Sequence, residues 1–194
     1  MLTAISTLVI TSCQKDQKTP VAQNLTAGDA TFANVNPLDT IPGILKVLEG
    51  NQLIADGYAK GVQIYQVQRS ATDPNAFSWV NIAPLATLFK KPDFTDQFIL
   101  HFAGPTWQFT KGANNGQRVV AKKLQGVTED TTAIQWLLLQ AVDSLSSADN
   151  EITFIQRLFT VGGLAPKTGA DEAHLGQLDS IPYTARYFFY EAKH

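Results

Sequence analysis

From about residue 41 onward, short runs of apolar and β-branched residues alternate with clusters of Gly, Pro, Asn and Asp. Residues 62–67 alternate between apolar and polar side chains, the period of two that is typical of a half-buried strand. Two longer runs, residues 152–161 and 183–190, lie near the C-terminus. Because almost no segment shows the helical period, the pattern predicts a mainly β fold. We expect a single-domain antiparallel β-sandwich or barrel of about nine strands, with one or two short helices.

Glycine and proline positions indicate how these runs are connected. Residues 53–58 and 62–67 flank Lys60-Gly61, which predicts a hairpin. Residues 83–89 carry Pro84 near their start, which is typical of the first turn of a helix, so a brief helix is expected there. Further strands are expected at residues 77–82, 97–102, 106–109 and 117–121.

Three segments need separate comment. Asn115-Gly116 is the strongest hairpin motif, because a type I′ turn requires positive φ at both central residues. Residues 134–142 form a continuous apolar run that suits a buried strand or a helix, and we favour a strand. Residues 45–48 suit either a short strand or one turn of helix.

Composition limits the classes of protein to consider. The 194 residues are 44% hydrophobic, which suits one globular domain rather than two. The formal net charge of −2 and the absence of any long basic run argue against a nucleic-acid partner.

The only cysteine, Cys13, ends a short apolar segment at the N-terminus. Residues 2–10 have the length of the apolar region of a signal peptide, and Ile10-Thr-Ser-Cys13 resembles a bacterial lipobox. No Lys or Arg precedes this run. We therefore expect residues 1–12 to be a lipoprotein signal peptide, 13–40 a flexible tether and 41–194 one β-rich domain. A lipid on Cys13 would anchor the protein to a membrane of the cell envelope, facing the periplasm or the cell surface.

No established catalytic or nucleotide-binding motif is present, and no cofactor or metal is expected. The sequence contains no G-x-G-x-x-G after a strand, no P-loop, no H-E-x-x-H and no G-x-S-x-G. The domain from residue 41 onward also contains no cysteine, which excludes a thiolate nucleophile and an internal disulfide there. Candidate chemistry therefore rests on a few isolated polar and aromatic side chains.

His101 lies at a predicted strand end beside a Gly-Pro turn and close to Trp107. It is expected to be either a buried histidine bonded to the backbone or a group facing a pocket that Trp107 borders. Arg157 lies in the middle of a predicted strand, where it needs a structural partner or an anionic ligand.

The loop before the last strand carries Asp171 and His174. These two residues are candidates for the pocket, and with His101 they are a weak candidate set for Zn²⁺; an acidic surface loop is the alternative. Tyr183, with Tyr187 and Trp107, is a candidate for a stacking platform that binds a sugar or another planar ligand, although aromatic residues on strands more often serve the core.

Six motifs along the chain resemble domain-of-unknown-function family 3455, in order and at similar spacing over roughly residues 40 to 191. They are Gly61-Val-Gln-Ile-Tyr65, His101-Phe-Ala-Gly-Pro-Thr-Trp107, Trp136-Leu-Leu-Leu139, Ile155-Gln-Arg157, Thr160-Val-Gly-Gly163 and Pro182-Tyr-Thr-Ala185 with Tyr187-Phe-Phe-Tyr190. The resemblance implies an exported single domain of undetermined function. Some relatives carry a malate dehydrogenase label, which does not fit a sequence without a nucleotide-binding pattern.

The resemblance also marks one departure. Relatives tend to carry cysteines where this chain has Val67 and Ala170, which implies that they bridge the late loop to an early strand. This chain lacks that disulfide, and losing such a bond usually lowers folding stability by about 2–5 kcal/mol.

We expect a lipid-anchored binding or structural module of the cell envelope that takes a small molecule or a glycan. The alternative is a hydrolytic enzyme in which His101 or His174 acts as acid or base. The candidate pocket residues are His101, Trp107, Arg157, Asp171, His174 and Tyr183.

Overall fold

The computed structural model describes residues 41–145 and 151–194, which all belong to one compact unit of the chain, Val35–His194. The predicted signal peptide, the Cys13 lipidation site and the tether lie outside the described residues. Among the described residues, no helix is both long enough and apolar enough to cross a bilayer.

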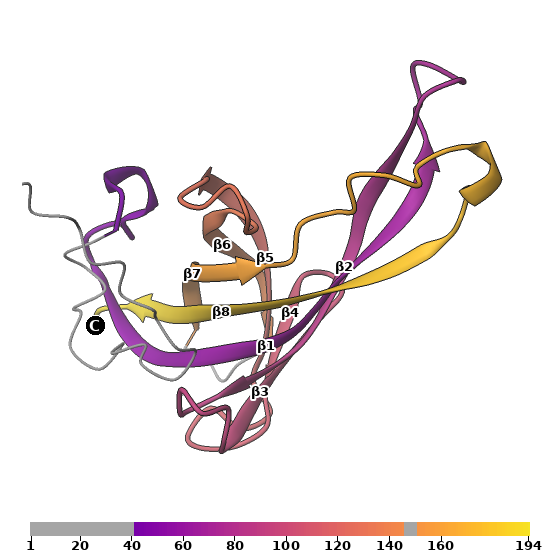
Figure 1. The fold of residues 1–194 in the computed structure, drawn as a ribbon. Helices are drawn as coiled ribbons and strands as arrows, with labels where there is room; N and C mark the ends of the chain where they lie inside the picture. The colour runs from indigo at the N-terminus through magenta and orange to yellow at the C-terminus, as the bar shows by residue number, and fades with distance from the viewer. Residues whose placement is uncertain (1–40, 146–150) are drawn as a thin grey trace, which may run out of the picture. The chain divides into compact units, whose positions relative to one another are not determined.

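Within residues 41–145 and 151–194, eight antiparallel strands form a closed barrel in which each strand pairs with its neighbour in sequence and β8 pairs with β1 (Figure 1). Mainly β structure was the prediction, and it is confirmed. Two short 3-10 helices accompany the strands in the described part: η2 (Gly43–Leu45) and η3 (Glu172–His174). The strands are β1 (Asn51–Arg69), β2 (Phe77–Phe89), β3 (Gln97–Phe102), β4 (Thr106–Phe109), β5 (Arg118–Val127), β6 (Trp136–Leu145), β7 (Ile152–Gly162) and β8 (Leu178–Ala192).

The hairpin expected at Lys60-Gly61 is wrong, and this error explains why the strand count is eight rather than nine. β1 runs without interruption through this point and pairs with β8 on one side and β2 on the other. Gly61 serves a close approach of two strands: a Cβ atom there would lie 2.2 Å from the Leu85 carbonyl oxygen and 2.5 Å from the Ala86 Cα. A turn and a close backbone contact both require glycine, so sequence alone did not separate them.

The brief helix expected over residues 83–89 is also wrong, because these residues continue β2. Pro84 pairs with Gln63 of β1. β3 pairs with β2 only from Ala86 onward, so Pro84 lies in a part of β2 that has no neighbour on its other side. An edge segment tolerates proline because the missing N–H donor leaves no ladder bond unmade.

Asn115-Gly116 does lie in the connection between β4 and β5, but not as a two-residue type I′ turn. Gly116 has a φ of 87°, whereas Asn115 is not among the residues with positive φ. The connection is longer than predicted, and the Asn115 N–H donates to the Gly112 carbonyl. Residues 134–142 fall largely in β6, so the strand favoured over a helix is correct.

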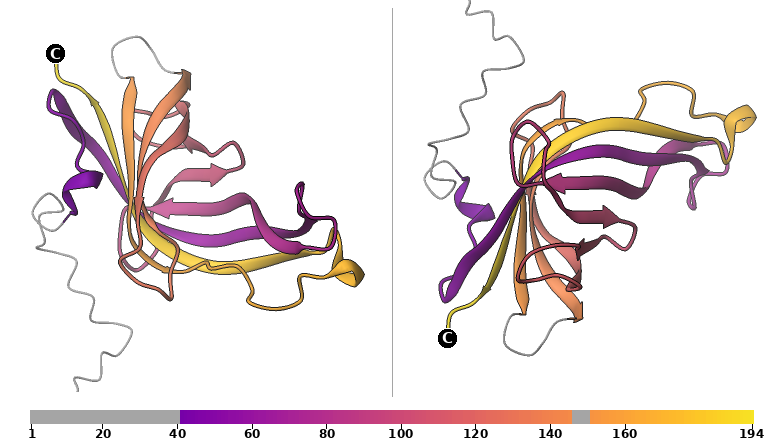
Figure 2. Two further views of the ribbon diagram at one scale, coloured as in Figure 1. Left: turned by 90° about the horizontal axis from the view of Figure 1, so that it is seen from above. Right: turned by 90° about the horizontal axis from the view of Figure 1, so that it is seen from below.

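Three strands extend past the rest of the barrel (Figures 1 and 2). We call this extension the arm and define it as residues 63–69 of β1, 77–83 of β2 and 178–181 of β8. The arm has strand partners only within itself, because β3 begins its pairing at Ala86 and β7 ends its pairing at Tyr183. The loop of residues 163–177 leaves β7, runs along the arm and carries η3 at its far end.

The core has two parts, one inside the barrel and one on its outer surface. The inner part is dominated by aromatic rings, among them Trp107, Phe109 and Phe189. The outer part covers β6 to β8 and includes Leu45 of η2, which packs with Phe188. Inside this outer cluster, the fully buried Gln156 donates to the Leu45 carbonyl at 2.7 Å and accepts from the Tyr190 hydroxyl at 2.7 Å. One buried polar side chain thereby fastens η2 to the barrel.

Candidate functional site

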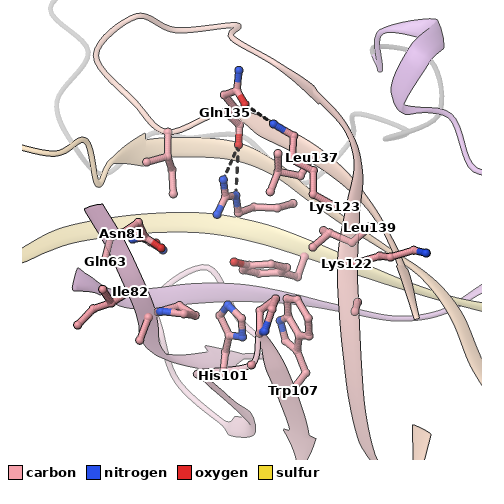
Figure 3. A pocket seen from close by; sticks show the side chains of 18 of the residues that line it. Gln63, Asn81, Ile82, His101, Trp107, Lys122, Lys123, Gln135, Leu137 and Leu139 are labelled. Atoms are coloured by element: carbon pink, nitrogen blue, oxygen red, sulfur yellow. Dashed lines mark hydrogen bonds between the residues drawn. The ribbon is translucent and has the colours of Figure 1, made fainter. Parts of the chain in front are cut away.

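A pocket of about 880 Å³ lies where the arm leaves the barrel. All strands contribute lining residues, which come from opposite walls of the barrel and from the base of the arm. In Figure 3, His101 and Trp107 lie on one wall and Gln135 lies across the pocket from them. The pocket is therefore assembled from segments that are far apart in the sequence.

One wall is a stack of buried aromatic rings. His101 of β3 and Trp107 of β4 are cross-strand partners, which brings their rings into a parallel stack with centroids 4.2 Å apart. Tyr187 of β8 meets both rings edge-on, at 5.4 Å from His101 and 5.7 Å from Trp107. The tight β3–β4 connection carries Gly104 and Pro105, which also line the pocket. A short turn between two strands thus holds this wall in place.

His101 is fixed as a neutral imidazole. Its Nδ1 lies 2.9 Å from the Thr106 carbonyl oxygen, and because a carbonyl only accepts, Nδ1 carries the proton. Nε2 is then an acceptor. Burial lowers the pKa of His101 to about 3, the Thr106 bond opposes this shift, and the positive charge of Arg157 adds to it. The charged form of His101 is therefore excluded at neutral pH.

Arg157 of β7 is one of the cations that line the pocket. The strand register places it between Leu137 of β6 and Tyr187 of β8, all three on the inner face. Its Nη2 donates to the Gln135 carbonyl at 2.9 Å and its Nε donates to the same oxygen at 3.2 Å (Figure 3). None of the ion pairs found within residues 41–145 and 151–194 includes Arg157. Its charge is met only by backbone and neutral groups.

A second cation is tied to the first through the same residue. Lys123 of β5 donates from Nζ to the Gln135 Oε1 at 2.8 Å, while the Gln135 carbonyl holds Arg157. Lys122 also lines the pocket and is exposed. Among the described residues that line this pocket there is no Asp or Glu. The lining is consequently positive.

Two buried donors in the pocket wall lack a hydrogen-bond partner among the described residues. They are the indole Nε1 of Trp107, whose side chain is 1% exposed, and the amide Nε2 of Gln63, which is 4% exposed. The Gln63 Oε1, by contrast, accepts from Asn81 of the arm at 2.9 Å. A buried donor left unpaired costs about 1–3 kcal/mol, so these two N–H groups call for an acceptor in the pocket.

Two tyrosines of β8 complete the polar interior. The hydroxyl oxygens of Tyr183 and Tyr187 are 3.4 Å apart. Burial raises the pKa of Tyr183 far above its usual value, and Tyr187 adds to the rise. Arg157 and Gln63 oppose it. The Gln63 amide lies near the Tyr183 hydroxyl, but the two do not form a hydrogen bond of normal geometry. Burial likewise raises the pKa of Tyr187, with Arg157 opposing. Both hydroxyls are therefore neutral donors and acceptors.

The structure brings together three of the six candidate residues on the pocket lining: His101, Trp107 and Arg157. Tyr183 does not line the pocket but contacts Tyr187, which does. The rings of these residues face the barrel interior rather than forming an open stacking platform.

Asp171 and His174 are not among the residues that line this pocket. His174 lies in η3 and Asp171 precedes it, in the loop that runs along the arm; both are exposed, and they pair with each other at 2.6 Å. The pairing with His174 lowers the pKa of Asp171. No group of three or more His, Cys, Asp or Glu side chains in the described part is placed to hold a metal ion, so the weak Zn²⁺ candidate set is not assembled.

The loop of residues 163–177 is bound to the arm by hydrogen bonds, although this chain has no cysteine at position 67 or 170. The Val67 N–H donates to the Gln177 carbonyl, and the Gly176 N–H donates to the Val67 carbonyl at 2.9 Å. The indole of Trp79 donates to the Thr168 carbonyl at 2.8 Å. Backbone bonds therefore hold the loop at the position of Val67.

Sequence reasoning missed Gln63, Asn81, Gln135 and Lys123. Neutral amides carry no motif, and the link from Lys123 through Gln135 to Arg157 joins β5 and β7 through the loop that precedes β6. The alternation in residues 62–67 did not help, because it sets the apolar Val62 and Ile64 against Gln63, whereas Gln63 is on the buried face of β1.

A comparison with protein families finds one match. The family described as Protein of unknown function (DUF3455) matches residues 48–191, so the chain belongs to this family. No curated protein and no solved structure matches the chain.

Proposed function

We propose that this DUF3455 domain is a binding module whose pocket, at the base of the arm, takes a small organic molecule. The supporting observation is the pair of buried donors without partners, Trp107 Nε1 and Gln63 Nε2, in the wall of a pocket of about 880 Å³. Pockets for organic ligands commonly measure about 300–1,000 Å³ and combine an apolar lining with a few directed polar groups. A ligand acceptor bound there would remove the cost of leaving these donors unpaired.

Binding is better supported than catalysis. A general acid or base works best with a pKa near the working pH, whereas burial lowers the pKa of His101 to about 3. His174 lies in η3, within the loop that runs along the arm, and is not part of the pocket lining. Neither His101 nor His174 therefore supports the hydrolase alternative at this pocket.

A small organic ligand is also better supported than a glycan. Sugar rings commonly stack on an exposed aromatic face, but Trp107 is 1% exposed and His101 covers one of its faces. Aliphatic side chains supply much of the remaining lining, including Leu137, Leu139 and Leu164. These surfaces favour an apolar body.

The proposal places the module in the cell envelope, anchored by a lipid on Cys13. Its support is the apolar run of residues 2–10 followed by Ile10-Thr-Ser-Cys13. Full-length wild type and Cys13→Ala are to be compared by membrane fractionation and by incorporation of radiolabelled palmitate. The variant is expected to lose both label and membrane association, and a Cys13→Ala protein that remains labelled and membrane-bound would contradict the anchor.

Thermal shift with a panel of small molecules, half of them charged, tests the pocket itself. Ala83→Trp fills the pocket at the base of the arm, because Ala83 lines it. Ala192→Trp is the matched control, since Ala192 is exposed at the end of β8. Ligands that stabilise wild type and Ala192→Trp but not Ala83→Trp are expected. Stabilisation that survives Ala83→Trp, or none with any compound, would count against this pocket.

A further inference from the structure

We infer that the ligand of this pocket is an organic carboxylate whose carboxyl group binds Arg157 and whose apolar body lies against the aliphatic wall. This inference rests on the proposed function and specifies the chemistry of the same site. It follows from four features of the lining: an interior cation without a counterion, the geometry of that cation, an excess of donors over acceptors, and an apolar surround.

Arg157 has no counterion among the described residues, although it is partly buried on the inner face of β7. A partly desolvated charge is costly unless an opposite charge or several hydrogen bonds compensate it. One backbone oxygen, that of Gln135, compensates only part of this charge. An anion entering the pocket would supply the rest.

The bonds that Arg157 already makes also orient it. Nε and Nη2 donate to the Gln135 carbonyl, which fixes that edge of the guanidinium plane. The N–H groups at the opposite end, on Nη1 and the second hydrogen of Nη2, are not used by the Gln135 carbonyl. The Tyr187 hydroxyl lies close enough to Arg157 for a hydrogen bond that lowers the tyrosine pKa, so a ligand bound there would share these donors with Tyr187. Two parallel N–H groups at the end of a guanidinium match the two oxygens of a carboxylate.

Other polar groups of the lining favour an acceptor-rich ligand in the same way. Trp107 Nε1 and Gln63 Nε2 are donors without partners. Lys122 and Lys123 add positive charge at the lining, and no Asp or Glu of the described lining opposes it. A cationic ligand would meet only repulsion here, whereas an anion is attracted from the mouth of the pocket to Arg157.

The apolar part of the lining indicates the chemistry of the rest of the ligand. Ile82, Leu137, Leu139, Val142 and Leu164 form an aliphatic surround. Inorganic phosphate has no apolar surface to contact this aliphatic surround, whereas a carboxylate with an apolar body matches both the cation and the aliphatic side chains. These features together assign the carboxylate class.

Matched acids and amides test the inference by isothermal titration with the folded chain. The probes are benzoate, 2-naphthoate, 4-phenylbutyrate and dodecanoate, each with its primary amide, and inorganic phosphate. At least one acid is expected to bind about 10- to 100-fold more tightly than its amide, the range given by hydrogen bonds to a charged group. Raising the salt concentration is expected to weaken the acid and leave the amide unchanged.

Three variants assign the preference to Arg157. Arg157→Gln is expected to reduce the affinity for the acid to that of the amide and to leave the amide within about threefold of wild type. Arg157→Lys keeps the charge without the paired N–H groups, so intermediate affinity for the acid is expected. Arg118→Gln is the matched control, because Arg118 lies on β5 outside the pocket lining and pairs at the surface with Asp143.

Each other outcome overturns a defined part of the account. Equal binding of acids and amides would overturn the carboxylate inference and leave the pocket as a binding site. Phosphate competing as well as the best acid would replace the carboxylate by a phosphate. A preference for acid that survives Arg157→Gln would remove Arg157 as the anion-binding group. If neither acids nor amides bind, both the inference and the proposed function fail.

Discussion

Protonation of His101 should make the stability of this domain depend on pH in a way that one substitution removes. The imidazole is 2% exposed, stacked on Trp107 and bonded through Nδ1 to the Thr106 carbonyl. A second proton on Nε2 would place a positive charge in this dry wall, in the field of Arg157. Lowering the pH should therefore destabilise the folded protein, and a variant without this imidazole serves as the control.

The direction and size of the change in stability with pH follow from the pKa values of His101 in the folded and unfolded chains. Burial lowers the folded pKa to about 3, while an unfolded histidine titrates near its ordinary value of 6.5. Between these values the unfolded chain binds a proton that the folded chain excludes, so the stability contribution is complete above about pH 6.5 and is lost as pH falls toward about 3. Integrating this difference gives a loss of about 2 kcal/mol between pH 8 and pH 5.

Urea unfolding followed by tryptophan fluorescence at pH 8, 7, 6 and 5 measures this loss in wild type and in His101→Gln. A glutamine can still donate to the Thr106 carbonyl but does not titrate. The variant has its own stability at pH 8, and only the change with pH is compared, so a general destabilisation does not affect the result. Carboxylates elsewhere titrate in both proteins and cancel.

The wild-type free energy of unfolding is expected to fall by about 2 kcal/mol more than that of His101→Gln between pH 8 and pH 5. Parallel pH dependences would refute the reasoning, because they would mean that His101 titrates alike in the folded and unfolded chains. That result would reopen His101 as an acid–base group at neutral pH.

Two further substitutions test the packing that positions the site. Gly61→Ala should destabilise the barrel by about 1–3 kcal/mol, since the added Cβ would lie 2.2 Å from the Leu85 carbonyl oxygen. Gly43→Ala is the control and should have little effect, because its added Cβ would have nothing within 4 Å. Equal stabilities of the two variants in thermal melts would contradict the close approach of β1 and β2. Tyr190→Phe should lower the free energy of unfolding by about 1–3 kcal/mol, because it leaves the buried Gln156 Oε1 without its donor. In a Gln156→Leu background, urea unfolding should show that the same substitution has little effect.

The sequence predicted strands well wherever the hydrophobic pattern was local. Residues 97–102 and 106–109 were placed where β3 and β4 lie, because a Gly-Pro turn separates two short apolar runs. Gly61 misled the prediction because its tight contact with β2 depends on residues more than twenty positions later in the chain. Pro84 misled it similarly, since an edge position is a property of the sheet.

In the site too, residues that are close in sequence were predictable, and contacts between distant strands were not. His101 and Trp107 are close in sequence, so their proximity was predictable, and Arg157 was notable as a charge within an apolar strand. The roles of Gln135 and Gln63 depend on which strands face each other across the barrel, and no local pattern indicates that. His174 was a candidate because its loop connects β7 and β8, but this loop follows the arm and carries η3 at its far end (Figure 2), and His174 does not line the pocket.

Indole N–H resonances in a ¹⁵N-labelled sample offer the most direct test of the central claim, that this pocket binds an organic acid. The chain has three tryptophans, and the Trp79 indole is already bonded to the Thr168 carbonyl, so it serves as the internal control. During titration with the best acid of the panel, the Trp107 indole proton should move downfield as it gains an acceptor, and the Trp79 signal should stay in place. A Trp107 signal that does not move while the acid binds would contradict the account.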